Sequence, residues 1–154
     1  MVKILKQSDQ NSKALRNASA HMNILLGELE TAEMFAQAGT MDPDEDNSGF
    51  RKYREGIVIH AKAVVNGTKD LVAFTRGGHG IEKVIDTVKI STESVEQLLT
   101  SVKSSASSLG SEYKNIQVLL LESAKKMTVS VITLIKCLEK LHHNSIFLNS
   151  RNCV

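Results

Sequence analysis

Apolar side chains recur along most of this chain at alternating steps of three and four residues. That spacing places them on one face of an α-helix, whereas a strand would show strict alternation. The β-branched residues follow the same steps, so the pattern predicts an all-α protein. Four stretches carry it, with these inward-facing residues: Leu15, Ala18, Met22, Leu25, Leu29, Ala32 and Ala36; Phe50, Tyr53, Ile57, His60, Val64, Gly67, Leu71 and Phe74; Ile81, Ile85, Val88, Thr92, Val95, Leu99, Val102, Ala106 and Leu109; and Leu120, Ala124, Met127, Val131, Leu134, Leu138 and Leu141.

Capping residues and glycines predict where the first two helices begin and end. The first helix is expected to start at a cap on Ser8 or Asp9 and to stop at Gly39. The second helix is expected from a cap at Ser48 to about Arg76. The segment between them, GTMDPDEDNSG, contains the only proline of the chain and is expected to be a loop.

The last two helices follow the flexible segment GGHG at residues 77–80. The third is expected from Ile81 to Leu109, and the fourth from about Ser111 to His143. Long helices joined by short loops predict an antiparallel up-and-down four-helix bundle, with residues 1–143 as a single domain. Residues 144–154 lose the helical spacing, and we expect a loosely ordered C-terminal tail.

The composition fits a packed protein and excludes some classes of partner. Hydrophobic residues make up 42% of the 154 residues and charged residues 23%. The formal net charge of +2 comes from 19 basic and 17 acidic residues spread along the chain, so we expect no nucleic-acid partner. No apolar run is long enough for a signal peptide or a membrane span, so we expect a soluble cytoplasmic protein.

Candidate chemistry is sparse, and we expect no enzyme activity, no metal and no cofactor. The two cysteines, Cys137 and Cys153, form neither a disulfide framework nor a CxxC metal pair. The five histidines include no pair at the i, i+3 or i, i+4 spacing of a helical metal site. The acidic loop lacks the ordered twelve-residue pattern of a calcium site. Function by contact is therefore favoured over function by reaction.

Three segments resemble the helical bundles of the talin rod family, most of all the ninth. They are ELETAEMFAQAGTM at residues 28–41, REGIVIHAKAVVNGTKDLV at residues 54–72 and ASSLGSEYKNIQVLLLESAKKM at residues 106–127. The resemblance implies a module of a cytoskeletal adaptor that links integrin adhesion receptors to actin. It also implies location in the cytoplasm at cell adhesions, and membrane contact only indirectly through integrin complexes.

The resemblance also implies partners. In this family such bundles dock on the talin head or donate a helix to vinculin, so the expected partners are the talin head, a vinculin-like head and other actin-linked adhesion proteins. Related bundles of this type have five helices, and MVKILKQ aligns with the end of the first one. We therefore expect either that the four helices close up or that a groove remains for a partner or a second copy. Where the family has an acidic head-contacting residue, this chain has Thr100.

The fourth helix is the candidate protein-binding element. Its sequence LLLESAKKMTVSVITLIKCLEKLHH is apolar on more than one face, and its spacing is similar to that of vinculin-binding helices. The resemblance places binding residues at Leu120, Ala124, Met127, Val131, Leu134, Ile135 and Leu138. The same spacing also suits an ordinary core helix.

Two other function classes are open. One is a small four-helix-bundle enzyme or metal-binding protein, which would need pairs of carboxylates and histidines facing the interior. The other is a membrane-surface protein, which would need aromatic anchors and a lysine-rich border that are sparse here.

Overall fold

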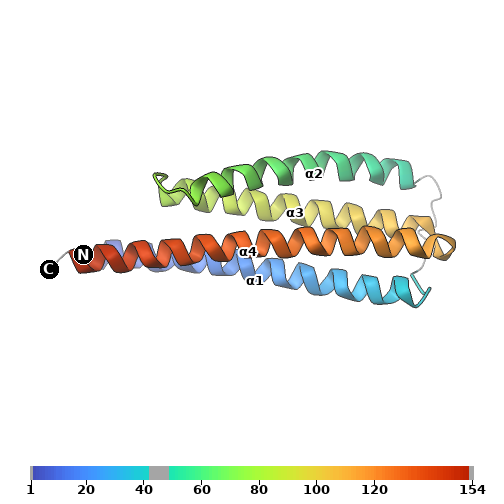
Figure 1. The fold of residues 1–154 in the computed structure, drawn as a ribbon, viewed down its shortest axis with the longest axis horizontal. Helices are drawn as coiled ribbons and strands as arrows, with labels where there is room; N and C mark the ends of the chain where they lie inside the picture. Colours follow the sequence, from blue (N-terminus) through green and yellow to red (C-terminus); the bar gives the residue numbers. More distant parts are fainter. Residues whose placement is uncertain (1, 42–48, 153–154) are drawn as a thin grey trace.

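The computed structural model describes the backbone of residues 2–41 and 49–152, and the side chains of residues 6–41 and 50–145. Four long helices account for nearly all of it: α1 (Val2–Gln37), α2 (Gly49–Phe74), α3 (Ile81–Leu109) and α4 (Lys114–Asn152). A short 3₁₀ turn (Ser111–Tyr113) precedes α4, and the described residues contain no strand. The predicted all-α four-helix bundle is confirmed (Figure 1).

The helix boundaries agree with the expected ones for α3, and α2 begins at Gly49, directly after the expected cap position, whereas the start of α1 and the end of α4 differ. Helix α1 begins at Val2 and passes through Ser8 and Asp9, because a residue that can cap a helix does not have to end it when the backbone continues to hydrogen bond. Helix α4 continues past the expected end at His143 to Asn152. The division into a bundle and a tail remains a prediction, and the acidic loop and Cys153 lie outside the described residues.

Helices α1 and α4 form one antiparallel pair, and α2 and α3 form the other. Two contacts fix the register of the first pair: Ser19 Oγ donates to Glu139 Oε1 (3.0 Å), and Lys125 Nζ donates to Glu33 Oε2 (2.7 Å). The residue numbers in each contact have the same sum, as expected for two helices that run in opposite directions.

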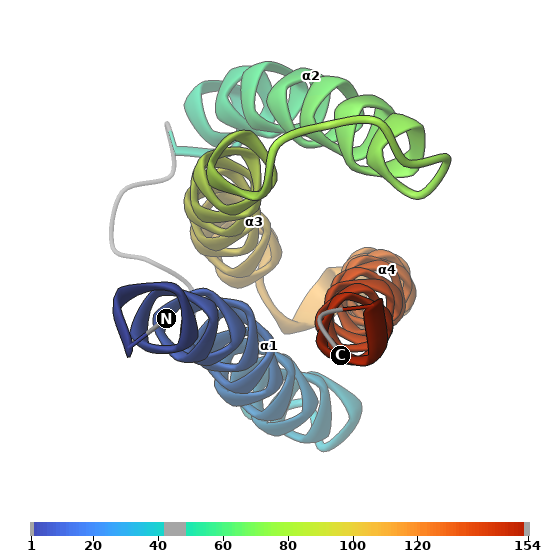
Figure 2. The same cartoon turned by 90° about the vertical axis from the view of Figure 1, so that its left-hand side faces the viewer.

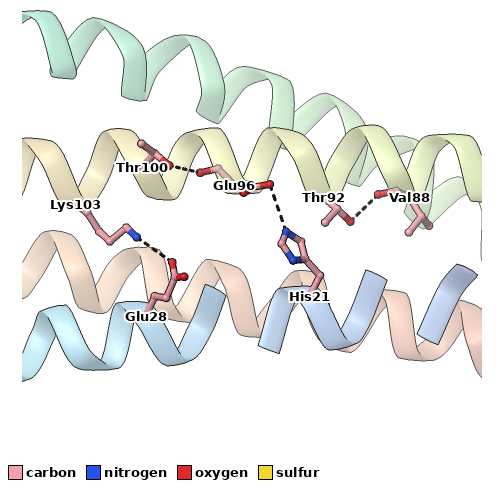
Figure 3. Close-up of polar contacts among 7 residues, drawn as sticks. All are labelled: His21, Glu28, Val88, Thr92, Glu96, Thr100 and Lys103. Carbon is pink, nitrogen blue, oxygen red and sulfur yellow. Dashed lines mark hydrogen bonds and ion pairs between the residues drawn. The ribbon is translucent and has the colours of Figure 1, made fainter. Parts of the chain in front are cut away.

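The two pairs are joined mainly through α3. Helices α1 and α3 run parallel, and two ion pairs, each spanning 75 residues of sequence, hold them in one register (Figure 3). His21 Nε2 lies 3.3 Å from Glu96 Oε2, and Lys103 Nζ lies 3.0 Å from Glu28 Oε2. These side chains are partly exposed, so the pairs orient the helices more than they stabilise them.

The buried face of α4 is rotated from the predicted one. The residues without any solvent exposure are Gln117, Leu121, Thr128 and Ile135. The predicted core residues Leu120, Met127 and Leu134 are only half-buried, and Leu141 is exposed. The cause is the position of α4, which packs closely on α1 and α3 and touches α2 at few points.

One side of the bundle is consequently open. Viewed along the helices, α2 and α4 lie apart from each other, and α3 lies between them on one side (Figure 2). Helices α2 and α4 run in the same direction along the bundle, and side chains of both helices line a groove.

Candidate protein-interaction groove

The groove between α2 and α4 is lined by apolar and small side chains. Its lining residues are Val64, Val65, Thr68, Lys69 and Val72 of α2 with Met127, Ser130 and Val131 of α4. A second hollow continues it along α2 towards Ile57 and Val58. We call this surface, including both hollows, the α2–α4 groove.

The α2 wall carries three valines that a closed bundle would bury. Val58, Val65 and Val72 are 48%, 53% and 44% exposed, and their spacing of seven residues aligns them along the helix. A row of exposed β-branched aliphatic residues on one helical line is typical of a surface that another protein covers. The three valines were not predicted as site residues from the sequence, although Val65 and Val72 lie beside the stripe predicted for the second helix.

The α4 residues that line the groove, Met127, Ser130 and Val131, are uncharged. The helical line that passes through Met127 and Ser130 follows steps of four and three residues and also carries Ile116, Leu120, Ser123, Leu134, Cys137 and Leu141. None of these residues is acidic or basic, and Cys137 is a free, exposed cysteine. The charged residues of α4 lie on its other faces.

The seven predicted binding residues of α4 divide between the core and the groove. Ala124, Val131, Ile135 and Leu138 are buried. Leu120, Met127 and Leu134 are half-buried and pack against the edge of the core, and of the seven residues Met127 and Val131 also line the groove. A partner that used the whole set would therefore have to separate α4 from the bundle, whereas a partner in the groove would reach only part of it.

Most of the described ionisable groups lie on the outer surface, and Glu33, which is buried, is paired with Lys125. Within the described residues, no group of three or more His, Cys, Asp or Glu side chains is placed to hold a metal ion. The hydrogen bond to Glu33 raises the pKa of Lys125 above its ordinary value, and the negative charges of Glu33, Glu30 and Glu122 raise it further. This contact joins α1 to α4 and is not part of a reactive site. Among the described helices, none is long and apolar enough to cross a membrane.

Comparison with known proteins identifies the type of bundle. No established protein-family profile matches the chain. Curated talins do: over 131 residues, 85% of this chain, it is 32% identical to talin of Oscarella pearsei, 33% to talin-1 of Gallus gallus and 31% to talin-2 of Homo sapiens.

The chain is a talin rod-like domain. It spans about 5% of the length of the talins it matches, so it corresponds to one small part of those proteins. Each of four talins matches over 131 residues, 85% of this chain, so the similarity reaches well beyond the three sequence segments.

Thr100, the position where the talin family was expected to carry an acidic residue, lies on the exposed face of α3. Its hydroxyl donates to the carbonyl oxygen of Glu96 (3.0 Å), one helical turn earlier (Figure 3). This hydroxyl is therefore occupied within its own helix. The acidic groups of the same region, Glu96 and Glu28, are paired with His21 and Lys103.

Proposed function

We propose that this domain is a protein-interaction module of a talin-like cytoskeletal adaptor, which works in the cytoplasm at cell adhesions and links integrin complexes to actin. The observation that carries the proposal is the combination of talin similarity with one open apolar side of the bundle. Rod-like domains without a reactive cluster act by contact, so we propose no enzymatic role. Its location is tested by expressing the tagged chain in spread, adherent cells. Enrichment at adhesions supports the proposal, and a uniform distribution contradicts it.

The proposed partners are proteins of the same adhesion machinery, with a vinculin-like head as the first candidate. Helix α4 would supply the contact residues Leu120, Ala124, Met127, Val131, Leu134, Ile135 and Leu138. Four of these are buried in the closed bundle, so the proposal requires opening, after which the apolar stripe exchanges one set of neighbours for another.

A peptide of residues 114–145 tests this part of the proposal. The peptide is expected to bind a purified vinculin-like head, and its Leu134→Ala variant to bind more weakly, because an apolar residue of the proposed contact set is lost. A Val129→Ala variant is the matched control, since Val129 is exposed and lies outside the proposed contact set. No binding of the unmodified peptide at high micromolar concentration rejects α4 as the vinculin-binding element.

The talin head is the second proposed partner, and a second copy of the chain is the third. For the head, Thr100 offers no charge and its hydroxyl is already engaged, so the α3 face lacks the acidic contact expected of the family. For a second copy, size-exclusion chromatography with light scattering is decisive: a dimer supports self-association through the groove, and a monomer at high concentration rejects it.

A further inference from the structure

The edge of α2 that borders the groove alternates valines with basic residues. Arg54, Val58, Lys62, Val65, Lys69, Val72 and Arg76 follow steps of four and three residues, and all are exposed. We call Arg54, Lys62, Lys69 and Arg76 the basic rim. We propose that the α2–α4 groove takes an amphipathic helix whose apolar stripe is bordered, on the side next to α2, by carboxylates. This inference rests on the proposed function as a protein-interaction module, and it specifies the chemistry of the partner.

The occupant has to be a helix because of what the walls of the groove offer. Both walls are α-helices, so their backbone N–H and C=O groups are already used within α2 and α4. An extended peptide would leave its own backbone groups unpaired against apolar side chains, which is costly. A helix satisfies its backbone internally and presents side chains at the three- and four-residue steps that both walls share. From Arg54 to the end of α2 at Phe74 the edge is about 30 Å long, which a helix of roughly 20 residues covers, and Arg76 follows in the turn after α2.

The charge of the occupant follows from the difference between the two walls. The α4 wall is uncharged, whereas the basic rim holds positive charge along the length of the α2 edge. The ion pairs found among the described side chains do not involve Arg54, Lys62 or Lys69. The acidic residues Glu55 and Asp70 are each next in sequence to a rim residue, which puts them about 100° away around the helix. Carboxylates on one edge of the incoming helix would therefore meet basic side chains that take part in none of the ion pairs of the described side chains.

The same rim disfavours a second copy as the occupant. Two grooves that face each other about a twofold axis bring the two α2 edges, or an α2 edge and a neutral α4 wall, into contact. The first arrangement opposes like charges, and the second leaves the rim without acidic partners. A partner with an acidic edge is better matched than this chain is to itself.

A pair of designed peptides tests the inference on the whole chain. Both are 22-residue helices with the same leucine stripe, one with glutamates and the other with lysines along a single edge, and each carries a fluorescent label for anisotropy. The glutamate peptide is expected to bind about ten-fold more tightly at low salt, and the preference to narrow as salt is added. A scrambled glutamate peptide without a continuous apolar stripe controls for simple charge attraction.

Two matched double variants test whether the preference for the glutamate peptide depends on the basic rim. Lys62→Glu with Lys69→Glu is expected to reverse the preference, so that the lysine peptide binds more tightly. Lys13→Glu with Lys89→Glu changes the net charge equally on the opposite side, between α1 and α3, and is expected to keep the original preference.

The possible results separate the inference from the proposed function. If the glutamate and lysine peptides bind equally tightly, both to the unchanged chain and to the Lys62→Glu/Lys69→Glu variant, the inference of an acidic partner is overturned. The groove would then bind helices without selecting them by charge. Binding of the scrambled peptide as tightly as the designed one also overturns it. If neither designed peptide binds, both the inference and the role of this groove fail, and if light scattering shows a dimer under the same conditions, a second copy is the occupant.

Discussion

Replacing Gly67 by alanine is expected to cost stability relative to the same change at Gly27, although both glycines lie inside helices. Alanine is the better helix former by about 1 kcal/mol, and at Gly27 a new Cβ meets no heavy atom within 4 Å. At Gly67 the new Cβ would lie 2.5 Å from Ser91 Oγ and 3.4 Å from Ser91 Cβ across the α2–α3 contact. The serine hydroxyl must rotate away or the two helices must separate.

The balance of these two effects sets the size of the prediction. Overpacking in a well-packed contact costs about 1–3 kcal/mol, which offsets or exceeds the gain in helix propensity. Gly67→Ala is therefore expected to be neutral or destabilising by up to about 2 kcal/mol, whereas Gly27→Ala is expected to stabilise by up to about 1 kcal/mol. For a domain of this size each kcal/mol shifts Tm by about 2–4 °C.

Thermal and urea unfolding of the two variants measure this difference, and Ser91→Ala identifies its cause. Ser91 Oγ is buried without a hydrogen-bond partner among the described residues, so its removal loses no hydrogen bond. The Gly67→Ala/Ser91→Ala double variant is expected to regain stability lost by Gly67→Ala alone. If Gly67→Ala stabilises as much as Gly27→Ala, the close approach of α2 and α3 is refuted.

Two further predictions test the α1–α4 pair. Leu121→Ala is expected to destabilise the fold by about 2–5 kcal/mol because the side chain of Leu121 is fully buried. Leu119→Ala is expected to change stability by at most about 0.5 kcal/mol because the side chain of Leu119 is 62% exposed. Equal effects of the two variants in urea unfolding would contradict the orientation of α4. The raised pKa of Lys125 means that its contact with Glu33 stabilises the fold below the ordinary lysine value of 10.5 and ceases to do so as pH rises through the higher folded pKa. The difference in unfolding free energy between the unchanged chain and its Lys125→Met variant is accordingly expected to be constant between neutral pH and about pH 9, and to shrink only above 10.5. A difference that disappears by pH 9 would be inconsistent with the contact.

Helical spacing was sufficient to predict the number of helices, the ends of α3 and most of the core. Leu15, Met22, Leu29, Val95 and Leu99 lie on predicted stripes and are fully or almost fully buried. The spacing reports which residues share a face, and in α1 and α3 the regular steps of three and four residues mark one continuous apolar stripe. The orientation of each helix towards its neighbours then follows.

The same reasoning was less accurate for α4, which has two adjoining apolar faces. The lines through Leu120 and Leu121 both carry aliphatic residues, and spacing alone cannot decide which one faces the core. That choice depends on the neighbours: contacts with α1 and α3 bury Leu121 and Ile135, while the distance to α2 leaves Met127 on the groove.

The basic rim was also beyond sequence reasoning. Lysines and arginines at exposed helical positions are ordinary until the opposite wall is known, and the open side became visible only when α2 and α4 were placed in space. The exposed valines of α2 were the available signal, because they extend its apolar face beyond the width needed to cover α3.

The most direct test of the central claim is to place a fluorescent reporter in the groove. The chain contains no tryptophan, so Val65→Trp provides a single emitter on the α2 wall, and Ile24→Trp provides a control on the exposed face of α1. When the glutamate-edged helix is added, the emission of Val65→Trp is predicted to shift to shorter wavelength and to become resistant to acrylamide, while that of Ile24→Trp stays unchanged. An unchanged Val65→Trp signal at saturating peptide, or a shift at Ile24→Trp instead, would contradict the assignment of the α2–α4 groove as the binding surface.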